Sequence, residues 1–348
     1  MGKWKVIVTA RSFGQVSSRP AEILTSAGCE VVSSSIDRPL DSDELSGMVS
    51  QADAIIVGND QVSGSVIESA PRLKVISRYG AGVDNIDIRA ATARGVVVTN
   101  TPGVNDEAVA DLAVGLMISL ARHICPTVDM VRQGKWTRIL GMDMAGKNVG
   151  VVGLGRVGKA VVRRLAGFDV TTLAYDPVRD DRFARDYGVS YVPLNTLLGC
   201  SDFVTLHTPL TQQTRHLIGA RELSLMKPTA FLINASRGGV VDEEALYAAL
   251  KEKRIAGAAL DVFSHEPPFG NPLITLDNVL VTSHIGGYTR ESVDNMGILA
   301  ATNVVDVLEG RKTRYVVNPE VYEDRKWEQR DTARHACHND RRCTERGD

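Results

Sequence analysis

The chain has 348 residues, of which 43% are hydrophobic and 24% charged, so it is long enough for two domains with separate cores. Its formal net charge of −2 gives no broad basic surface and disfavours nucleic acid as a partner. The five cysteines are scattered, the N-terminus lacks a signal-peptide pattern, and the apolar region at 109–121 is too short to span a bilayer; together these features predict a cytoplasmic protein without a membrane partner.

The first third of the chain alternates short apolar runs with helical segments. The runs predict buried parallel strands at 5–9, 52–58, 73–77 and 95–100. Such alternation is typical of α/β layering. A long helical pattern follows at 105–121, and an irregular stretch follows at 132–146.

A second and more regular alternation occupies the rest of the chain. It predicts strands at 148–153, 170–176, 202–207, 229–234, 255–261 and 278–283. A final helix at 291–308 leads to 315–319, which could return as a strand to the first domain. We therefore expect two doubly wound parallel-sheet domains, with 103–288 inserted into a domain formed by 1–102 and 289–318. Half of the residues at 319–348 are charged, which predicts a disordered tail.

A glycine-rich loop follows the predicted strand at 148–153. Gly153, Gly155 and Gly158 have G-x-G-x-x-G spacing and open a helix, which is the context that a dinucleotide-binding loop requires. The free amides at the helix N-terminus would bind the phosphates. Asp176 ends the next strand and could accept hydrogen bonds from the adenosine ribose, which favours NAD over NADP. Arg179 and Arg182 lie close enough to keep NADP open.

The segment "INASRGGVVD" places Arg237 where a buried strand ends. An unpaired buried charge is very costly, so this cation needs an acidic partner. Asp242 or Glu243 could provide one, and so could the carboxylate of a bound ligand.

Several ordered motifs carry a family resemblance over residues 5–319: "RYGAGVDNID", "GLGRVG", "YDP", "LHTPLTQQTRHLI", "NASRGGVVDEEAL", "GAALDVFSHEPP" and "SHIGGYT". The chain resembles the D-isomer-specific 2-hydroxyacid dehydrogenases, particularly the branch that is similar to D-3-phosphoglycerate dehydrogenase. The resemblance implies two Rossmann-like domains, NAD as cofactor, and hydride transfer between nicotinamide and a small anionic 2-hydroxy or 2-keto acid. The domain at 103–288 would bind NAD, and the discontinuous domain would bind the substrate.

The resemblance implies a catalytic trio of Arg237, Glu266 and His284. Reduction of a 2-keto acid needs a proton donor for the developing alkoxide, and an imidazole near working pH suits this role. Glu266 would accept a hydrogen bond from the other ring nitrogen of His284 and fix its tautomer. Arg237 would hold the substrate carboxylate, which would explain a cation at a strand end.

Further positions carry over from the resemblance. Those implied to contact the cofactor are Gly153, Gly155, Arg156, Val157, Gly158, Asp176, Thr208, Pro209, Ala235, Ser236, Asp261, Gly286 and Gly287, with Asp261 near the nicotinamide carboxamide. Those implied to contact the substrate are Arg78, Tyr79, Gly80, Ala81 and Gly82, together with Arg237. Glycines in the substrate loop would let successive N–H groups converge on an anion.

One departure concerns the substrate. Phosphoglycerate-type enzymes tend to place a second arginine after the strand at 52–58, whereas this chain has Gly58 followed by Asn59 and Asp60. A phosphate beside Asp60 with one basic contact fewer would bind less well. A smaller 2-hydroxy acid is then plausible; a phosphonate, phosphite or formate-type substrate and an NAD-sensing corepressor-like role remain alternatives.

Two peripheral features complete the sequence-based predictions. The segment 123–146, with Trp136 and Arg138, matches the region that family members use for dimer contacts, so the resemblance predicts a homodimer. His335, Cys337, His338 and Cys343 lie close together in the tail, but their spacing matches no zinc pattern, and no metal is expected.

Overall fold

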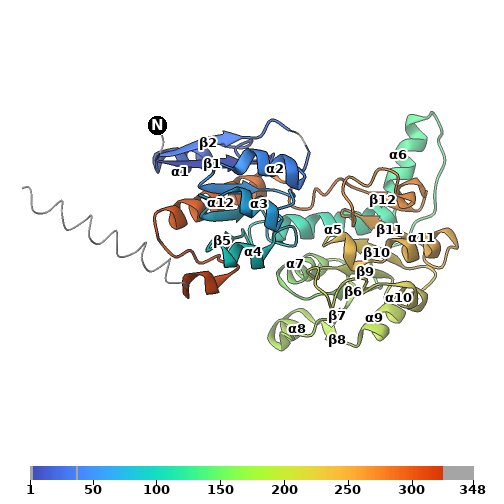
Figure 1. The fold of residues 1–348 in the computed structure, drawn as a ribbon. Coiled ribbons are helices and arrows are strands. Elements are labelled where there is room, and N and C mark those ends of the chain that lie inside the picture. The colour runs from blue at the N-terminus through green and yellow to red at the C-terminus, as the bar shows by residue number, and fades with distance from the viewer. Residues whose placement is uncertain (1–2, 37, 324–348) are drawn as a thin grey trace, which may run out of the picture. The chain divides into compact units, whose positions relative to one another are not determined.

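The computed structural model describes residues 3–36 and 38–323. The chain forms two compact units. Unit 1 contains the residues up to Val104 and those from Arg290 onward, and unit 2 contains Asn105–Thr289. Each unit is built on one parallel sheet flanked by helices (Figure 1), so the predicted α/β class with two doubly wound sheets is confirmed.

Unit 1 has a five-stranded sheet in the order β2-β1-β3-β4-β5, with every pair parallel. Its strands are β1 (Trp4–Val8), β2 (Cys29–Ser33), β3 (Ala54–Val57), β4 (Val75–Arg78) and β5 (Val97–Thr99). Its helices are α1 (Arg19–Ser26), α2 (Ser42–Val49), α3 (Gly64–Ser69), α4 (Ile88–Ala93) and α12 (Arg290–Leu308), and a 3₁₀ turn, η3, covers Pro319–Glu323.

Strand alternation divides the core of unit 1 into two layers. Val6 and Val8 of β1 face a cluster that includes residues of α1 and α12, whereas Ile7 between them faces the cluster of α2 and α3. Side chains of a strand point alternately to its two faces, so a strand covered on both faces reads as a continuous apolar run. This periodicity explains why the sequence predicts β1 and β3 so clearly.

The segment at 315–319 returns to the sheet of unit 1 through single contacts. Val316 forms an isolated antiparallel bridge with Thr99, and the N–H of Val317 donates to the carbonyl of Val98. Asn318 is fully buried; its amide oxygen accepts from the N–H of Val98, and its amide nitrogen donates to the carbonyl of Val96. The segment therefore returns to the sheet at the position that the sequence suggested. It forms a single bridge there and not a strand.

Unit 2 has a seven-stranded parallel sheet in the order β12-β11-β10-β9-β6-β7-β8. Its strands are β6 (Asn148–Val152), β7 (Thr171–Tyr175), β8 (Ser190–Tyr191), β9 (Phe203–Leu206), β10 (Phe231–Asn234), β11 (Gly257–Leu260) and β12 (Val279–Val281). The strand order reverses beside β6, because β7 lies on one side of it and β9 on the other. In open α/β sheets, ligands bind beyond the carboxyl ends of the strands at such a reversal.

Helices cover both faces of the second sheet. One core cluster includes residues of α5 (Asp106–Ala121), α7 (Arg156–Leu165) and α8 (Asp181–Tyr187). The other includes residues of α9 (Leu194–Cys200), α10 (Ala220–Leu225) and α11 (Glu243–Lys251). Two short 3₁₀ turns, η1 (Gly238–Val240) and η2 (Pro272–Thr275), follow β10 and β11.

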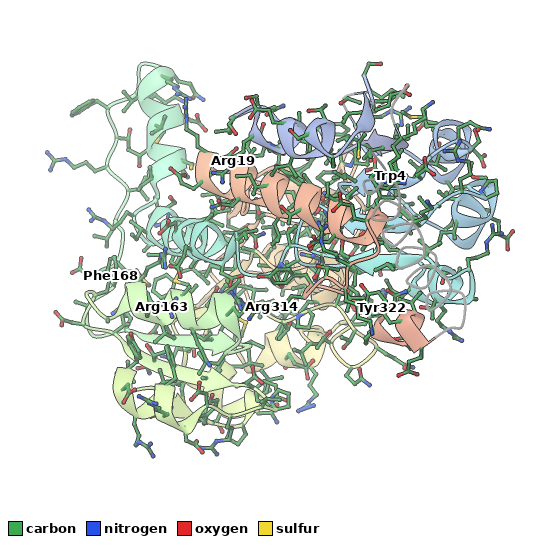
Figure 2. The ribbon with its side chains drawn as sticks, turned by 90° about the vertical axis from the view of Figure 1, so that its left-hand side faces the viewer. Trp4, Arg19, Arg163, Phe168, Arg314 and Tyr322 are labelled. Atoms are coloured by element: carbon green, nitrogen blue, oxygen red, sulfur yellow. The ribbon has the colours of Figure 1, made fainter. Side chains whose placement is uncertain are left out.

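Charged pairs connect α5 to α7 on their exposed side. Arg163, labelled in Figure 2, pairs with Glu107 at 2.8 Å, and Arg164 pairs with both Glu107 and Asp111. Residues of α7 and α5 also pack together below these pairs in one apolar cluster. Exposed ion pairs contribute little stability, so the apolar contacts hold the two helices together.

Helix α6 (Ile124–Arg132) and the segment after it expose several large apolar side chains. None of the α6 residues is buried, and the side chains of Trp136 and Leu140 are 87% and 94% exposed. Within the described residues, no single helix is long and apolar enough to cross a membrane; α5 and α6 pass that test only as a pair bent by 63°.

Candidate active site

The glycine loop after β6 leaves room for a ligand. Gly153 has a φ of +92°, and a Cβ there would lie 2.7 Å from the carbonyl oxygen of His207. A Cβ at Gly158 would lie 2.1 Å from the carbonyl oxygen of Gly153, so no side chain fits at either position. A Cβ at Gly155, by contrast, would have no atom within 4 Å.

Helix α7 begins directly after Gly155 and has no side-chain cap. Arg156, Val157 and Gly158 form its first turn, with N–H groups that have no intrahelical acceptor. Open space at Gly155 next to these donors fits a pyrophosphate. The side chain of Arg156 turns to α5, where its Nε lies 2.6 Å from Oδ2 of Asp106.

Asp176 follows β7 and contacts the glycine loop directly. Its Oδ2 accepts from the N–H of Leu154 at 2.7 Å, and its Oδ1 accepts from the N–H of Val178 at 2.8 Å. Each carboxylate oxygen keeps a further lone pair that a ribose hydroxyl can use. Arg179 pairs with Asp181 and lies over the ring of Tyr191.

His207 and Thr208 follow β9 at the same edge of the sheet. Their Nδ1 and Oγ1 atoms are buried without a hydrogen-bond partner, whereas Nε2 of His207 lies 2.9 Å from Oγ1 of Thr205. Burial lowers the pKa of His207 to about 4, so the ring is neutral at pH 7. Two unsatisfied polar atoms beside Gly153 fit a polar ligand. Sequence reasoning named Thr208 and Pro209 but missed His207, although it ends a buried strand.

His284 and Glu266 meet after adjacent strands. Nδ1 of His284 lies 2.7 Å from Oε2 of Glu266, and Oε1 of Glu266 accepts from the N–H of Phe263 at 3.1 Å. Burial raises the pKa of Glu266, but the hydrogen bond and charge of His284, together with the charge of Arg237, outweigh burial and hold this pKa below its usual value. The carboxylate fixes which ring nitrogen of His284 carries the proton and leaves Nε2 for chemistry.

Arg237 follows β10 by three residues and precedes η1. Its Nη1 donates to the carbonyl of Ser236 at 2.7 Å, and its own carbonyl accepts from Nδ2 of Asn234. The sequence left Asp242 and Glu243 open as its partners. In the structure, Asp242 caps α11 by accepting from Ala245. Glu243 accepts hydrogen bonds from a different loop, at residues 264–271.

Residues 234–236 continue β10 toward Arg237. Both the N–H and the hydroxyl of Ser236 donate to Oδ1 of Asn234, and Ala235 is buried. The strand therefore ends in a tight polar turn that presents Arg237 at the carboxyl edge of the sheet.

Asp261 organises the histidine loop. It is 1% exposed, and its carboxylate accepts from Oγ1 of Thr282 and from the N–H groups of Ile285 and Gly286 at 2.6–2.8 Å. The N–H of His284 donates to the carbonyl of Asp261, while His284 itself has a φ of +55°. These four bonds hold a backbone conformation that residues other than glycine seldom adopt. The contact of Asp261 with nicotinamide stays a prediction.

Gly286 and Gly287 complete this loop in a crowded environment. A Cβ at Gly286 would lie 3.0 Å from Oδ2 of Asp261, and a Cβ at Gly287 would lie 3.0 Å from Nδ2 of Asn105. A side chain at Gly286 would press on the carboxylate of Asp261, and one at Gly287 would press on the amide of Asn105.

The predicted substrate loop belongs to unit 1. Arg78 is 7% exposed, and its Nη2 donates to Oδ1 of Asn59 at 2.8 Å while its Nη1 contacts the carbonyl of Tyr79. The guanidinium lies against Gly80, whose φ is +141°; a Cβ there would be 3.0 Å from Nη1. The carbonyl of Ala81 accepts from Asn100, and Gly82 follows it.

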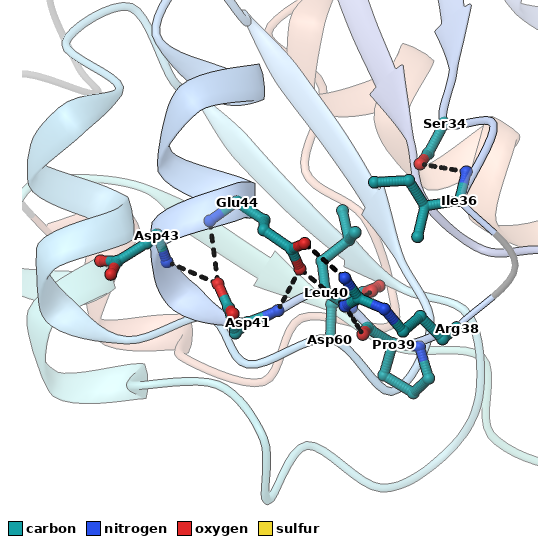
Figure 3. Close-up of polar contacts among 9 residues, drawn as sticks. All are labelled: Ser34, Ile36, Arg38, Pro39, Leu40, Asp41, Asp43, Glu44 and Asp60. Atoms are coloured by element: carbon teal, nitrogen blue, oxygen red, sulfur yellow. Dashed lines mark hydrogen bonds and ion pairs between the residues drawn. The ribbon is translucent and has the colours of Figure 1, made fainter.

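The carboxylate of Asp60 is buried and satisfied. It accepts from Oγ1 of Thr9 and from the N–H groups of Leu40 and Gly58, and it is 2% exposed. Figure 3 shows Asp60 beside Leu40, just before the capping box of α2. The structure thus gives the Asp60 carboxylate three neutral donors within unit 1, and the expectation that a phosphate binds less well beside it stays a prediction. The other part of that departure, a glycine at position 58 in place of an arginine, is a fact of the sequence and is unchanged.

The metal-ligating side chains of residues 3–36 and 38–323 do not gather into a metal site. In that part of the chain, no cluster of three or more His, Cys, Asp or Glu side chains could hold a metal ion. The tail predicted as disordered at 319–348 begins with the 3₁₀ turn η3 at Pro319–Glu323, where Val321 is buried, so the prediction is wrong for these residues. The rest of the tail, with His335, Cys337, His338 and Cys343, lies outside the described residues.

Comparison with known proteins identifies a matching protein family and several similar proteins. Residues 114–286 match the model of the D-isomer specific 2-hydroxyacid dehydrogenase NAD binding domain. The chain is 45% identical over 281 residues to a glyoxylate reductase of Korarchaeum cryptofilum, covering 78% of this chain and 85% of that protein. It is 44% identical over 283 residues to a D-3-phosphoglycerate dehydrogenase of Methanocaldococcus jannaschii, covering 80% of this chain but only 54% of that protein.

Solved structures of other proteins are also similar to this chain. The TT0316 protein of Thermus thermophilus is similar with a TM-score of 0.81 and 36% identity, over 90% of this chain and 99% of that one. The apo D-lactate dehydrogenase of Escherichia coli is similar with a TM-score of 0.78 and 30% identity, also over 90% and 99% of the two chains.

Proposed function

Because this chain belongs to the family of D-isomer specific 2-hydroxyacid dehydrogenases, we propose that it is an NADH-dependent reductase of small, unphosphorylated 2-keto acids such as glyoxylate. The observation that carries the proposal is the hydrogen bond between His284 and Glu266, 2.7 Å long, at the carboxyl edge of the sheet that also presents the glycine loop. A proton donor and a dinucleotide loop at one sheet edge are what a keto-acid reductase needs.

Each member of the trio has one role. His284 donates a proton from Nε2 to the developing alkoxide, and Glu266 holds the opposite ring nitrogen and stabilises the protonated ring. Arg237 binds the substrate carboxylate, because a guanidinium can donate two parallel hydrogen bonds to it. Bound NADH supplies the hydride, and the glycine loop with Asp176 would hold it.

NAD is the proposed form of the cofactor. The carboxylate of Asp176 would accept from the ribose hydroxyls and repel a 2′-phosphate. Arg179 and Arg182, which could favour NADP, are paired with Asp181 and Asp186. Their positive charge is thus partly offset at the position where a 2′-phosphate would need it.

The substrate is proposed to be short because one basic contact is missing. Gly58 stands where phosphoglycerate-type enzymes tend to have an arginine, and Arg78 donates to Asn59. Relatives named glyoxylate reductase, from Korarchaeum cryptofilum and Thermofilum pendens, are 45% and 43% identical to this chain. Reduction of 3-phosphohydroxypyruvate is the second candidate.

We also infer a cytoplasmic homodimer. The exposed apolar face of α6, with Trp136 and Leu140 after it, supports a second copy of this chain as the partner, because such large apolar side chains rarely stay in water. Sedimentation of the wild type and of the variant Trp136→Ser tests this inference: a wild type that sediments as a monomer would refute it.

The experiment that tests the function is a panel of 2-keto acids assayed with NADH and with NADPH. We expect turnover of glyoxylate and hydroxypyruvate with NADH, weak turnover of 3-phosphohydroxypyruvate, and a preference for NADH over NADPH. Efficient reduction of the phosphorylated acid would overturn the substrate proposal. No oxidation of NADH with any member would overturn the reductase proposal.

A further inference from the structure

One carboxylate fastens both ends of the loop that carries Glu266. Oε1 of Glu243 accepts from the N–H of Ser264 at 2.6 Å, and Oε2 accepts from Nδ2 of Asn271 at 2.7 Å. Ser264 and Asn271 border the segment in which Glu266 lies, and Glu243 is the first residue of α11. A single side chain thus bridges a loop that otherwise has few backbone bonds of its own.

A short path of hydrogen bonds connects Glu243 to the histidine. Phe263 is its centre: the N–H of Phe263 donates to Oε1 of Glu266, and the next N–H along the chain, that of Ser264, donates to Oε1 of Glu243. The other oxygen of Glu266 binds His284. A shift of the Phe263–Ser264 peptide would therefore move the acceptor that orients the imidazole.

The segment that carries Arg237 touches the same peptide. A Cβ at Gly238 would lie 1.9 Å from the carbonyl carbon of Phe263 and 2.1 Å from the nitrogen of Ser264, so the two backbones are in direct contact. Arg237 and Glu243 flank this contact along the chain. Glu243 hence secures the Glu266 loop against the segment that presents the arginine.

We propose that Glu243 is a positioning residue for the reaction: it fixes the Ser264–Asn271 loop, and through it the hydrogen bond between Glu266 and His284. The inference rests on the proposed function for the roles of Glu266 and His284. As a positioning residue, Glu243 would act through its two hydrogen bonds to this loop rather than on the substrate or the cofactor. Its effect is on geometry, and small displacements of acid–base groups cost large factors in rate.

The main test compares Glu243→Ala with Glu244→Ala. Glu244 is the next residue in the same first helical turn, is exposed, and loses the same charge near the helix N-terminus, so it is a matched control. We expect Glu243→Ala to lower kcat by about 10- to 100-fold with little change in NADH affinity. The acid limb of the kcat/KM profile should move to higher pH, because a looser bond to His284 lets the pKa of Glu266 return toward its usual value.

A second pair of variants guards against a folding defect. Asn271→Asp keeps the oxygen that accepts from Leu273 but loses the donor to Glu243, so it should share the kinetic defect. Combining it with Glu243→Gln reverses donor and acceptor across the pair, and this double variant should recover activity. Wild-type kcat in Asn271→Asp would overturn the proposal, and so would an Asn271→Asp defect that Glu243→Gln does not relieve in the folded double variant.

One measurement does not depend on turnover. The ring proton on Nδ1 of His284, assigned by its loss in His284→Asn, should weaken or shift in NMR spectra of Glu243→Ala and persist in Glu244→Ala. Wild-type inactivity on every keto acid would refute the proposed function alone. A His284 signal and a pH profile in Glu243→Ala that equal those of Glu244→Ala would refute the role of Glu243 alone.

Discussion

Nδ1 of His284 lies 2.7 Å from Oε2 of Glu266, although the two residues follow different strands, β12 and β11. Because the strands are parallel neighbours, their carboxyl ends deliver both residues to one edge of the sheet. The pair holds a defined tautomer of the imidazole, and the first prediction concerns its removal.

His284→Asn should lower turnover of 2-keto acids by on the order of 10²–10⁴ and leave NADH affinity nearly intact, because only proton transfer is lost. Steady-state kinetics and fluorescence titration with NADH measure the two effects. His216→Asn is the control, since His216 is an exposed histidine of the same unit. Unchanged turnover in His284→Asn would remove this residue from the mechanism.

Asp176→Asn should raise the ratio of kcat/KM for NADPH to that for NADH by about 10-fold. The amide oxygen can still accept from the N–H of Leu154, which keeps the bond to the glycine loop, while the N–H of Val178 loses its acceptor and the negative charge that repels a 2′-phosphate is removed. Kinetics with both cofactors at a fixed keto-acid concentration give the ratio. If the ratio stays constant, Asp176 does not set the preference.

Asp261→Asn should lower kcat by more than about 10-fold and destabilise the fold by about 1–3 kcal/mol. Its amide would direct an N–H at one of the donors that the buried carboxylate now binds, so the loop of His284 would lose its support. Denaturant unfolding and kinetics on one preparation measure both quantities. Wild-type kcat in a destabilised variant would show that Asp261 serves stability only.

His207 predicts a pH dependence of stability. Although part of the residue is exposed, Nδ1 is buried, and burial lowers the pKa of the folded form from 6.5 to about 4. At a pH between these two pKa values, the histidine of the unfolded chain binds a proton that the native ring does not bind. The free energy of unfolding therefore falls as the pH drops from about 6.5 to about 4. The slope contributed is up to about 1.4 kcal/mol per pH unit.

His207→Gln should remove that contribution, so its free energy of unfolding should fall less steeply over the same pH range than that of the wild type. Urea unfolding at half-unit pH steps provides the comparison, with His216→Gln as the exposed counterpart. Parallel curves for the wild type and His207→Gln would contradict the assignment of a neutral, buried ring.

Much of the fold follows from periodicity. Strands such as β3 and β10 are buried along their whole length and read as continuous apolar runs, so they are predictable. β2 escaped prediction because it lies at a sheet edge, contains the polar Glu30 and is only half-buried. α6 escaped because Pro126 interrupts its pattern and none of its residues is buried.

Only those residues of the site that lie in recognisable sequence motifs could be predicted from the sequence. The family and the class of cofactor followed from ordered motifs and are confirmed; the individual roles of the trio remain predictions. The roles of Glu243 and Asp261 in supporting loops follow from contacts between segments far apart in sequence, which no local pattern encodes. The burial of Asp60 is of the same kind, since its partners come from three separate loops.

The proton-transfer pair, the arginine and the dinucleotide loop all belong to residues 105–289, whereas Gly58, Asn59 and Arg78 belong to the other unit. The proposed roles therefore divide chemistry and substrate choice between the two compact units. If these proposed roles are correct, evolution or engineering could change the acid that is reduced by rewriting a few positions after β3 and β4, without altering the residues that would transfer hydride and proton.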